Sequence, residues 1–139
     1  MSTRSLVKVF EGSQCLTAVY RQSDGYPSGR GTDLAEFLTG LSIVNGISLA
    51  ETRRIANGAG CLAAQLIAHE KTGPGGIYVY SPSVSANGCG AEWVYSVRLP
   101  GPGLPPEAPS ITVRDVYRRR TYGPFDVASF AEFCKKEEA

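Results

Sequence analysis

Hydrophobic residues recur along this chain with two different spacings. In some segments every second residue is apolar, which is typical of strands, and in others every third or fourth residue is apolar, which is typical of helices. Residues 5–10 and 14–22 are rich in β-forming residues, and only residues 11–13 lie between them. Such a short connection predicts a hairpin, so the chain begins with two antiparallel strands.

Helical spacing follows the hairpin. Residues 33–39 and 48–56 each begin with Asp or Ser followed three residues later by Glu, a pattern that caps helix starts, so each is predicted to be a short helix. A longer helix is predicted from residue 59 to about residue 71, because one apolar stripe runs along it and a Thr-Gly-Pro sequence then stops it. The stripe consists of Leu62, Ala63, Leu66 and Ile67.

Three further strands are predicted over residues 77–81, 92–99 and 110–118, where β-forming residues alternate with polar ones. We expect these strands to form an antiparallel meander, followed by a final helix over residues 126–136. The pattern therefore predicts an α+β fold with a single domain over residues 1–139. We expect about five mostly antiparallel strands, with two to four helices packed on one face of the sheet.

Composition narrows the class of protein. The chain has 139 residues, of which 42% are hydrophobic and 19% are charged, and its formal net charge is +1. This near-neutral charge disfavours a general nucleic-acid binder, which needs a basic face. The longest uncharged apolar runs, of 14 residues each, are too short to cross a bilayer, and the first residues lack an apolar signal segment. We therefore expect a cytoplasmic protein without a membrane partner.

Catalytic and metal-binding groups are sparse. The four cysteines form no CxxC pair and His69 is the one histidine, so no zinc pattern is present and no metal or other cofactor is predicted. Cys61 and His69 share one predicted helix, but residues eight positions apart are separated by about 12 Å, too far for a nucleophile and its base. An enzyme is therefore the less favoured class, although acid–base chemistry by Asp24, Asp33 and Glu36 stays open.

The segment YRQSDGYPSGRGT, residues 20–32, is the densest functional candidate. Its glycines let backbone N–H groups approach a ligand closely, and the helix start that follows adds donors with partial positive charge. Two arginines offer forked donors to a phosphate or carboxylate, and two tyrosines offer flat faces for a base or a hydroxyl contact. The predicted ligand-binding residues here are Tyr20, Arg21, Asp24, Tyr26, Ser28, Gly29, Arg30, Gly31 and Thr32.

The same segment also fits a purely structural role. Glycine allows a positive φ, Pro27 fixes a bend and Asp24 caps the turn locally, so a rigid connection from strand to helix has the same composition. The spacing is neither that of a P-loop nor that of the dinucleotide-binding fingerprint. The sequence therefore leaves both interpretations open.

A second glycine-rich helix start precedes the longest predicted helix. We predict that Asn57, Gly58 and Gly60 bind an anion there, and two such helix starts facing each other would suit a ligand with two phosphates. Close packing of a helix end against the sheet also needs small residues, which is the structural alternative.

Three stretches within residues 17–80 resemble a family of small uncharacterised proteins from bacteriophages and prophage-like regions: YRQSDGYPSGRGTDLAEFL, IVNGI and ANGAGCLAAQLIAHEKTGPGGIYVY. The DGYPSG and NGxGCLAAQL segments are specific to that pattern, although relatives commonly carry His at the position of Arg30. The resemblance implies a small phage accessory protein in the cytoplasm of the bacterial host. Such proteins often counter host defence, either by sequestering a nucleotide signal or by blocking a defence protein through direct contact.

Two functions therefore compete. The leading one is a non-enzymatic binder of a small phosphorylated or nucleotide-like ligand, with Arg21, Arg30 and the backbone of residues 28–32 as its anion site. The other is a protein inhibitor or adaptor, which contacts a host protein through a surface made of residues 81–91, 100–109 and 118–120.

Two surface features concern larger partners. Arg114 and residues 118–120, with Tyr117 and Tyr122 nearby, form a basic and aromatic cluster that fits nucleic acid or an acidic protein, and equally a solvated strand end. Tyr78 and Tyr80 make one strand face more apolar than a solvated sheet needs, which predicts a homo-oligomer.

Overall fold

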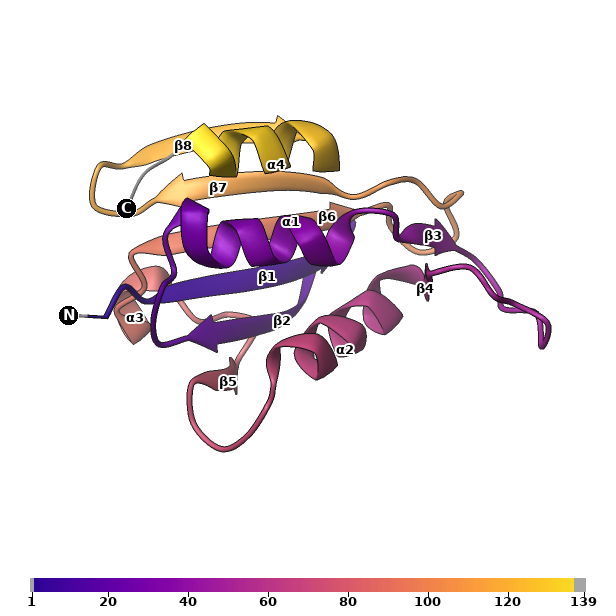
Figure 1. Cartoon of the computed structure of the whole chain (residues 1–139), viewed down its shortest axis with the longest axis horizontal. Helices are drawn as coiled ribbons and strands as arrows, with labels where there is room; N and C mark the ends of the chain where they lie inside the picture. Colours follow the sequence, from indigo (N-terminus) through magenta and orange to yellow (C-terminus); the bar gives the residue numbers. More distant parts are fainter. Residues whose placement is uncertain (1, 137–139) are drawn as a thin grey trace.

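A computed structural model describes residues 2–136 of the chain. Its centre is a six-stranded sheet in the order β5-β2-β1-β6-β7-β8 (Figure 1). A separate two-stranded ribbon, β3 with β4, extends from one end of the molecule. The strands are β1 (Ser5–Glu11), β2 (Gln14–Arg21), β3 (Ser42–Val44), β4 (Ile55–Asn57), β5 (Ile77–Tyr80), β6 (Trp93–Leu99), β7 (Ser110–Asp115) and β8 (Arg120–Phe125).

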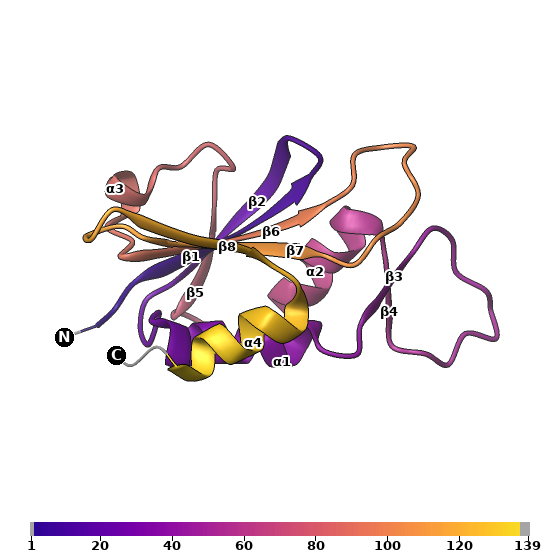
Figure 2. The same ribbon diagram turned by 90° about the horizontal axis from the view of Figure 1, so that it is seen from above.

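Helices cover the two faces of this sheet unequally. The described residues contain α1 (Thr32–Leu38), α2 (Gly58–Glu70), α3 (Ala86–Cys89) and α4 (Val127–Lys136), with a short π-helix, η1 (Pro27–Gly31), directly before α1. Helices α1, α2 and α4 pack on one face, whereas the short α3 lies on the other (Figure 2). The predicted α+β fold is confirmed, and α3 is an unpredicted helix on the opposite face.

The strand order differs from the predicted meander. β5 pairs with β2 at one edge of the sheet, and β6 pairs with β1 in parallel, so β5 and β6 are not neighbours. The other neighbouring pairs of this sheet are antiparallel. The predicted meander is right for β6 and β7, which are antiparallel neighbours. It is wrong for β5, because the buried strand β1 needs a hydrogen-bonded strand on each side and β6 occupies the side that β2 leaves free. β8 is an edge strand that the sequence pattern does not predict.

The helix predicted over residues 48–56 does not occur in the described structure. Ser48 accepts a hydrogen bond from the N–H of Ala50 at 3.1 Å, but no helix follows. The neighbouring apolar side chains, Ile47 and Leu49, are exposed. A capping pattern without an apolar face to bury does not stabilise a helix, so this segment forms an open connection into β4.

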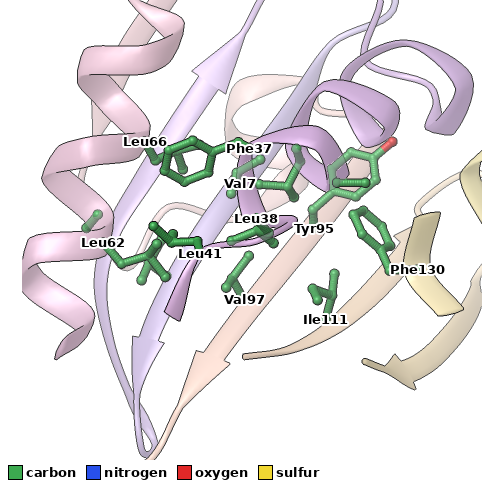
Figure 3. Packing of buried hydrophobic residues seen from close by; sticks show 14 of the residues in the cluster. Val7, Phe37, Leu38, Leu41, Leu62, Leu66, Tyr95, Val97, Ile111 and Phe130 are labelled. Atoms are coloured by element: carbon green, nitrogen blue, oxygen red, sulfur yellow. The ribbon is translucent and has the colours of Figure 1, made fainter. Parts of the chain in front are cut away.

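The main core lies between the sheet and α1, α2 and α4 (Figure 3). Alternation along the strands sends Val7 and Val97 into this core, while Leu6 and Ala18 face the opposite side, where residues of α3 cover them. The apolar stripe predicted for the longest helix packs into the main core. The side chains that meet there include Phe37, Leu62, Leu66, Tyr95 and Phe130.

Candidate functional site

Arg30, a predicted ligand residue, lies in the turn between β2 and α1 and is fully buried. Its Nε and Nη2 donate to the two carboxylate oxygens of Glu70 at 3.0 and 2.7 Å. Its Nη1 donates to the carbonyl oxygens of Ser5 and Val19 at 3.1 and 2.9 Å, and also to the Ser5 hydroxyl. The expectation that Arg30 clamps an exposed anion is therefore wrong, because its guanidinium joins β1, β2 and the end of α2.

The backbone N–H groups of the same turn are also occupied. Those of Gly29 and Gly31 donate to the carbonyl oxygen of Tyr26, at 2.9 and 3.5 Å. The N–H of Arg30 donates to the carbonyl oxygen of Asp24 at 2.8 Å. Since η1 uses these donors in the hydrogen bonds of the chain itself, the anion cradle predicted for this turn does not form.

Close packing explains the glycines of this turn. A Cβ on Gly25 would lie 2.6 Å from the Cβ of Ser5, and a Cβ on Gly31 would lie 2.7 Å from the Sγ of Cys134. A Cβ on Gly29 would collide with a backbone carbonyl of the turn. None of these three glycines has a positive φ, so that predicted reason for them is wrong. The turn is the rigid structural connection that the sequence left as the alternative.

The other predicted residues of the turn do not converge on one point. Tyr20 is buried on the face of the sheet that carries α3, where its ring stacks on Tyr80 with the centroids 5.1 Å apart. Tyr26 and Thr32 form hydrogen bonds within the turn, and Ser28 is exposed. Tyr20 is therefore packed against another tyrosine and does not offer its face to a ligand at the turn.

Two titratable side chains pack beneath the turn. Tyr95 donates its hydroxyl to the carbonyl oxygen of Gly25 at 2.7 Å, and burial raises the pKa of Tyr95 well above its usual value. Cys134 lies against Gly31, and burial raises the pKa of its thiol to about 12. Both groups are therefore protonated at neutral pH and act as parts of the core.

Arg21 lines a hollow of about 310 Å³ beside the turn, together with Asp33, His69 and Glu70. Its Nη1 lies 2.8 Å from the Oδ2 of Asp33. Glu70 is paired with Arg30, so the charges around this hollow balance. The charged side chains around this hollow are therefore occupied in ion pairs of the protein itself.

The second predicted site, at the start of α2, is open. Within the described chain the side chain of Asn57 does not cap the helix, because its Oδ1 accepts the N–H of Gly46 at 2.7 Å. Gly58 has a φ of 80°, which favours glycine. Gly60 has no such φ, and a Cβ there would meet no described atom within 4 Å. Packing therefore does not require glycine at position 60.

A hollow of about 260 Å³ lies beside this helix start, and we call it the α2 hollow. Asn57 and Gly58 form one wall, and the other walls come from Glu11 at the end of β1, from residues 43–45 and from residues 99–104. Figure 1 shows the start of α2, the β3–β4 ribbon and the β6–β7 connection at the same end of the molecule. The structure thus brings one predicted ligand site together with a loop that the sequence assigned to protein contact.

The two glycine-rich helix starts do not face each other. Glu70, at the C-terminal end of α2, binds Arg30 in the first of them. Asn57, at the N-terminal end of α2, pairs instead with Val44, which follows α1 in the chain. The two helix starts therefore lie at opposite ends of the molecule (Figure 1), and the expectation that one ligand with two phosphates joins them is wrong.

The surface predicted for a protein partner is divided. Residues 81–91 precede β6 and residues 100–109 follow it, so the two loops lie at opposite ends of that strand (Figure 2). Arg119, from the 118–120 segment, shares a hollow with the start of α3 and hence with the first loop. The three segments do not form one continuous contact surface.

The sequence analysis did not identify two side chains that lie beside the predicted site residues. Glu70 lies 40 residues from Arg30 in the sequence. Glu11 lies at the end of β1, far in the sequence from Asn57 and Gly58, with which it lines the α2 hollow. A signal for Glu70 exists, since it continues the four-residue spacing of Leu62 and Leu66 on the inner face of the helix. A carboxylate on that face needs a buried partner, and Arg30 is that partner.

Wider comparisons add no assignment. Among the described residues, no group of three or more His, Cys, Asp or Glu side chains is placed to hold a metal ion. Every helix within residues 2–136 is too short or too polar to cross a bilayer. No protein-family model, curated protein or solved structure matches the chain. The geometry of the hollows is therefore the basis for a functional proposal.

Proposed function

We propose that the protein binds a small phosphorylated ligand, about the size of a mononucleotide, in the α2 hollow, and that it does so without catalysing a reaction. The observation that carries this proposal is that the start of α2 opens into the hollow: Asn57, Gly58 and Ala59 line it, and packing does not account for the glycine at the next position, Gly60. The volume of about 260 Å³ lies just below the range of about 300–1,000 Å³ that is usual for ligand sites, which limits the ligand to a small one.

The phosphate is the part of such a ligand that α2 holds. The first N–H groups of a helix have no partner within the helix, and the helix dipole adds about half a positive elementary charge at that end. Helix α2 has 13 residues and no acidic residue in its first turn, so no carboxylate of that turn competes with an anion. Glycine lacks the Cβ that would keep a phosphate away from the backbone.

The other walls of the hollow suit a sugar and a base. Glu11 supplies a carboxylate that accepts hydrogen bonds from a vicinal diol, the contact that acidic residues make with ribose in dinucleotide-binding folds. Ile43 and Leu104 supply apolar surface. A nucleoside phosphate combines the anion, the diol and the flat apolar body that these three features recognise.

Sequestration is the role that such a site supports best. Binding alone removes a nucleotide signal from solution, so it requires a hollow and no catalytic side chains. This role agrees with the resemblance within residues 17–80, which implies a phage accessory protein acting against defence signalling in the bacterial cytoplasm.

Isothermal titration calorimetry with nucleoside monophosphates tests the proposal, and cyclic dinucleotides and ADP-ribose serve as larger compounds for comparison. We expect at least one nucleoside monophosphate to bind, and Gly60→Glu to weaken that binding at least about 10-fold, because its carboxylate repels an anion at the helix start. Gly60→Gln has nearly the same size without the charge and is the matched control. Both variants should fold, since an acidic residue in the first turn stabilises a helix and the space at position 60 is open.

Two results would contradict the proposal. One is the absence of binding by every nucleoside monophosphate tested. The other is equal affinity of the wild-type protein and Gly60→Glu for a compound that does bind, because that compound would then occupy a different site.

A protein contact at the same end of the molecule is the second candidate. Leu104, beside the α2 hollow, and Ile47 and Leu49, in the β3–β4 connection, are exposed large apolar side chains. In this case the partner is a host protein. A stoichiometric partner that is lost with Leu49→Asp and Leu104→Asp but kept with Gly60→Glu would favour this candidate over the ligand.

A homo-oligomer stays a prediction. In β5, Tyr80 stacks on Tyr20, whereas Tyr78 and Val79 are exposed. The Lys71 ammonium lies 5.5 Å from the ring centroid of Tyr78 and donates to a carbonyl oxygen of β5, which partly covers this edge of the sheet. Light scattering at tens of micromolar decides the question, because a monomer at that concentration would contradict the prediction.

A further inference from the structure

A third hollow, with a volume of about 430 Å³, is lined by residues of the β7–β8 turn and of the start of α3. Figure 2 shows these two segments at the same end of the sheet. Arg114, Tyr117 and Arg119 line one side of it, and Ser85 and Asn87 line the other. No carboxylate from residues 2–136 lines this hollow. We call it the turn hollow.

Positive charge is concentrated around the turn hollow. Arg114, Arg118, Arg119 and Arg120 are all exposed within one short segment. The carboxylate of the same segment, Asp115, points inward: its side chain is 8% exposed, and its Oδ1 accepts the backbone N–H of Arg118 at 3.1 Å. Its Oδ2 lies 3.9 Å from the Nε of Arg118, so Asp115 offsets at most one of the four positive charges.

Within residues 2–136, neither arginine of the hollow pairs with a carboxylate. Arg114 donates from Nη1 to the hydroxyl of Thr121 at 2.9 Å, which orients the guanidinium. Arg119 has a φ of 55°, a left-handed conformation that favours glycine. An arginine held in that conformation at the tip of a turn suggests a function for its side chain.

Tyr117 adds a flat surface beside these charges. It is 76% exposed, so its ring contributes little to the core. Guanidinium groups next to an exposed aromatic ring are the combination that binds single strands, because phosphates pair with arginine and an unpaired base stacks on the ring. We propose that the turn hollow binds single-stranded nucleic acid, with backbone phosphates on Arg114 and Arg119 and a base on Tyr117.

Other anionic partners use fewer of these features. An acidic peptide pairs with the arginines but leaves the ring without a role, and a duplex keeps its bases stacked inside and offers none to Tyr117. The formal charge of the whole chain is +1, which restricts the contact to this local patch. Two or three phosphates are therefore neutralised, and the binding weakens as salt is added.

Fluorescence anisotropy with a labelled ten-nucleotide oligothymidine tests this site. Between 50 and 200 mM salt, we expect log affinity to fall against log salt with a slope of about −1.4 to −2.1, at about −0.7 for each phosphate. Tyr117→Ala should weaken binding about 5- to 150-fold, whereas Tyr117→Phe keeps the ring and should retain binding. Arg119→Gly should weaken binding about 5-fold or more without lowering the melting temperature, because glycine accepts the positive φ.

Matched variants separate this site from general charge effects. Arg98→Gln removes an exposed arginine that does not line the turn hollow and should bind within about 2-fold of wild type. Gly60→Glu, in the first turn of α2 beside the α2 hollow, should bind the oligonucleotide like wild type, so the two proposals can fail independently.

Three results would overturn the proposal. The first is undetectable binding at 50 mM salt. The second is wild-type affinity in both Tyr117→Ala and Arg119→Gly. The third is binding of a labelled ten-residue polyglutamate as tightly as oligothymidine and without sensitivity to Tyr117→Ala, which would assign the patch to an acidic protein.

Discussion

Two helix starts in this protein are rich in glycine, and they differ in what surrounds those glycines. Before α1, the Cβ positions of Gly25, Gly29 and Gly31 are filled by β1, by the turn itself and by α4. At the start of α2, the Cβ positions of Gly58 and Gly60 meet no described atom within 4 Å. The same composition thus permits close packing in one place and exposes a helix start in the other.

The hydrogen bonds at the two helix starts differ in the same way. In the first turn, Arg30 and the neighbouring N–H groups donate to acceptors of the protein. At the second start, the residue before the helix uses its side chain elsewhere and leaves α2 uncapped within the described chain. Enrichment in glycine is therefore no evidence for a binding site until the neighbours of each glycine are known.

The largest expected effect in this comparison comes from removing Arg30. Arg30→Ala leaves the Glu70 carboxylate buried without its partner, which typically costs about 3 to 5 kcal/mol in the free energy of unfolding. A turn whose arginine served a ligand alone would lose no more than about 0.5 kcal/mol. Urea unfolding distinguishes the two values.

Arg21→Ala is the matched control for Arg30→Ala. The Arg21–Asp33 pair is partly exposed, so its loss should cost about 1 kcal/mol or less. Combining Arg30→Met with Glu70→Leu removes both buried charges and should recover most of the stability. Equally small losses for Arg30→Ala and Arg21→Ala would show that the buried pair does not stabilise the turn.

A smaller effect is expected from filling the space at Gly31. Gly31→Ala places a Cβ 2.7 Å from the Sγ of Cys134, so α4 must shift, at a cost of about 1 to 3 kcal/mol. Thermal unfolding measures this cost. In a double-mutant cycle, Cys134→Ala should make the two losses less than additive, because it removes the sulfur atom. Wild-type stability in Gly31→Ala would mean that the turn is looser than the structure describes.

The smallest effect has the opposite sign. Gly60→Ala should stabilise the protein by up to about 1 kcal/mol, because alanine favours a helix and the space for its Cβ is open. Gly58→Ala is the control and should destabilise, since the φ at that position is 80°. A clear loss of stability in Gly60→Ala, measured by thermal unfolding, would remove the difference between the two helix starts.

Local patterns predicted most of the elements. The β1–β2 hairpin, helices α1, α2 and α4, and strands β5, β6 and β7 occur close to their expected positions. The helix predicted over residues 48–56 is the exception. A capping pattern is present there, but Ile47 and Leu49 are exposed and no apolar face is buried, so the local signal is not sufficient. A capping pattern marks where a helix can start, and packing against the core decides whether it forms.

The candidate site was predictable in part. Asn57 and Gly58 line the α2 hollow, but Glu11 and residues 99–104 reach it from other parts of the chain. Arg30 was assigned to the wrong role because its partner, Glu70, lies 40 residues away. The four-residue spacing of Leu62, Leu66 and Glu70 indicates that the Glu70 carboxylate faces inward, but it does not identify Arg30 as the residue with which Glu70 pairs.

The sequence by itself determined the hydrophobic periods of the strands and helices, the helix starts and the fold class, because these depend on residues that lie next to one another in the chain. Tertiary structure alone decided the parallel β1–β6 pairing, the partner of Arg30 and which glycines are covered. Each of these depends on space and hydrogen-bond partners that distant segments supply. A glycine or an arginine has the same local signal whether that space is filled or open, and for this reason only the folded chain separates the packed turn from the open helix start.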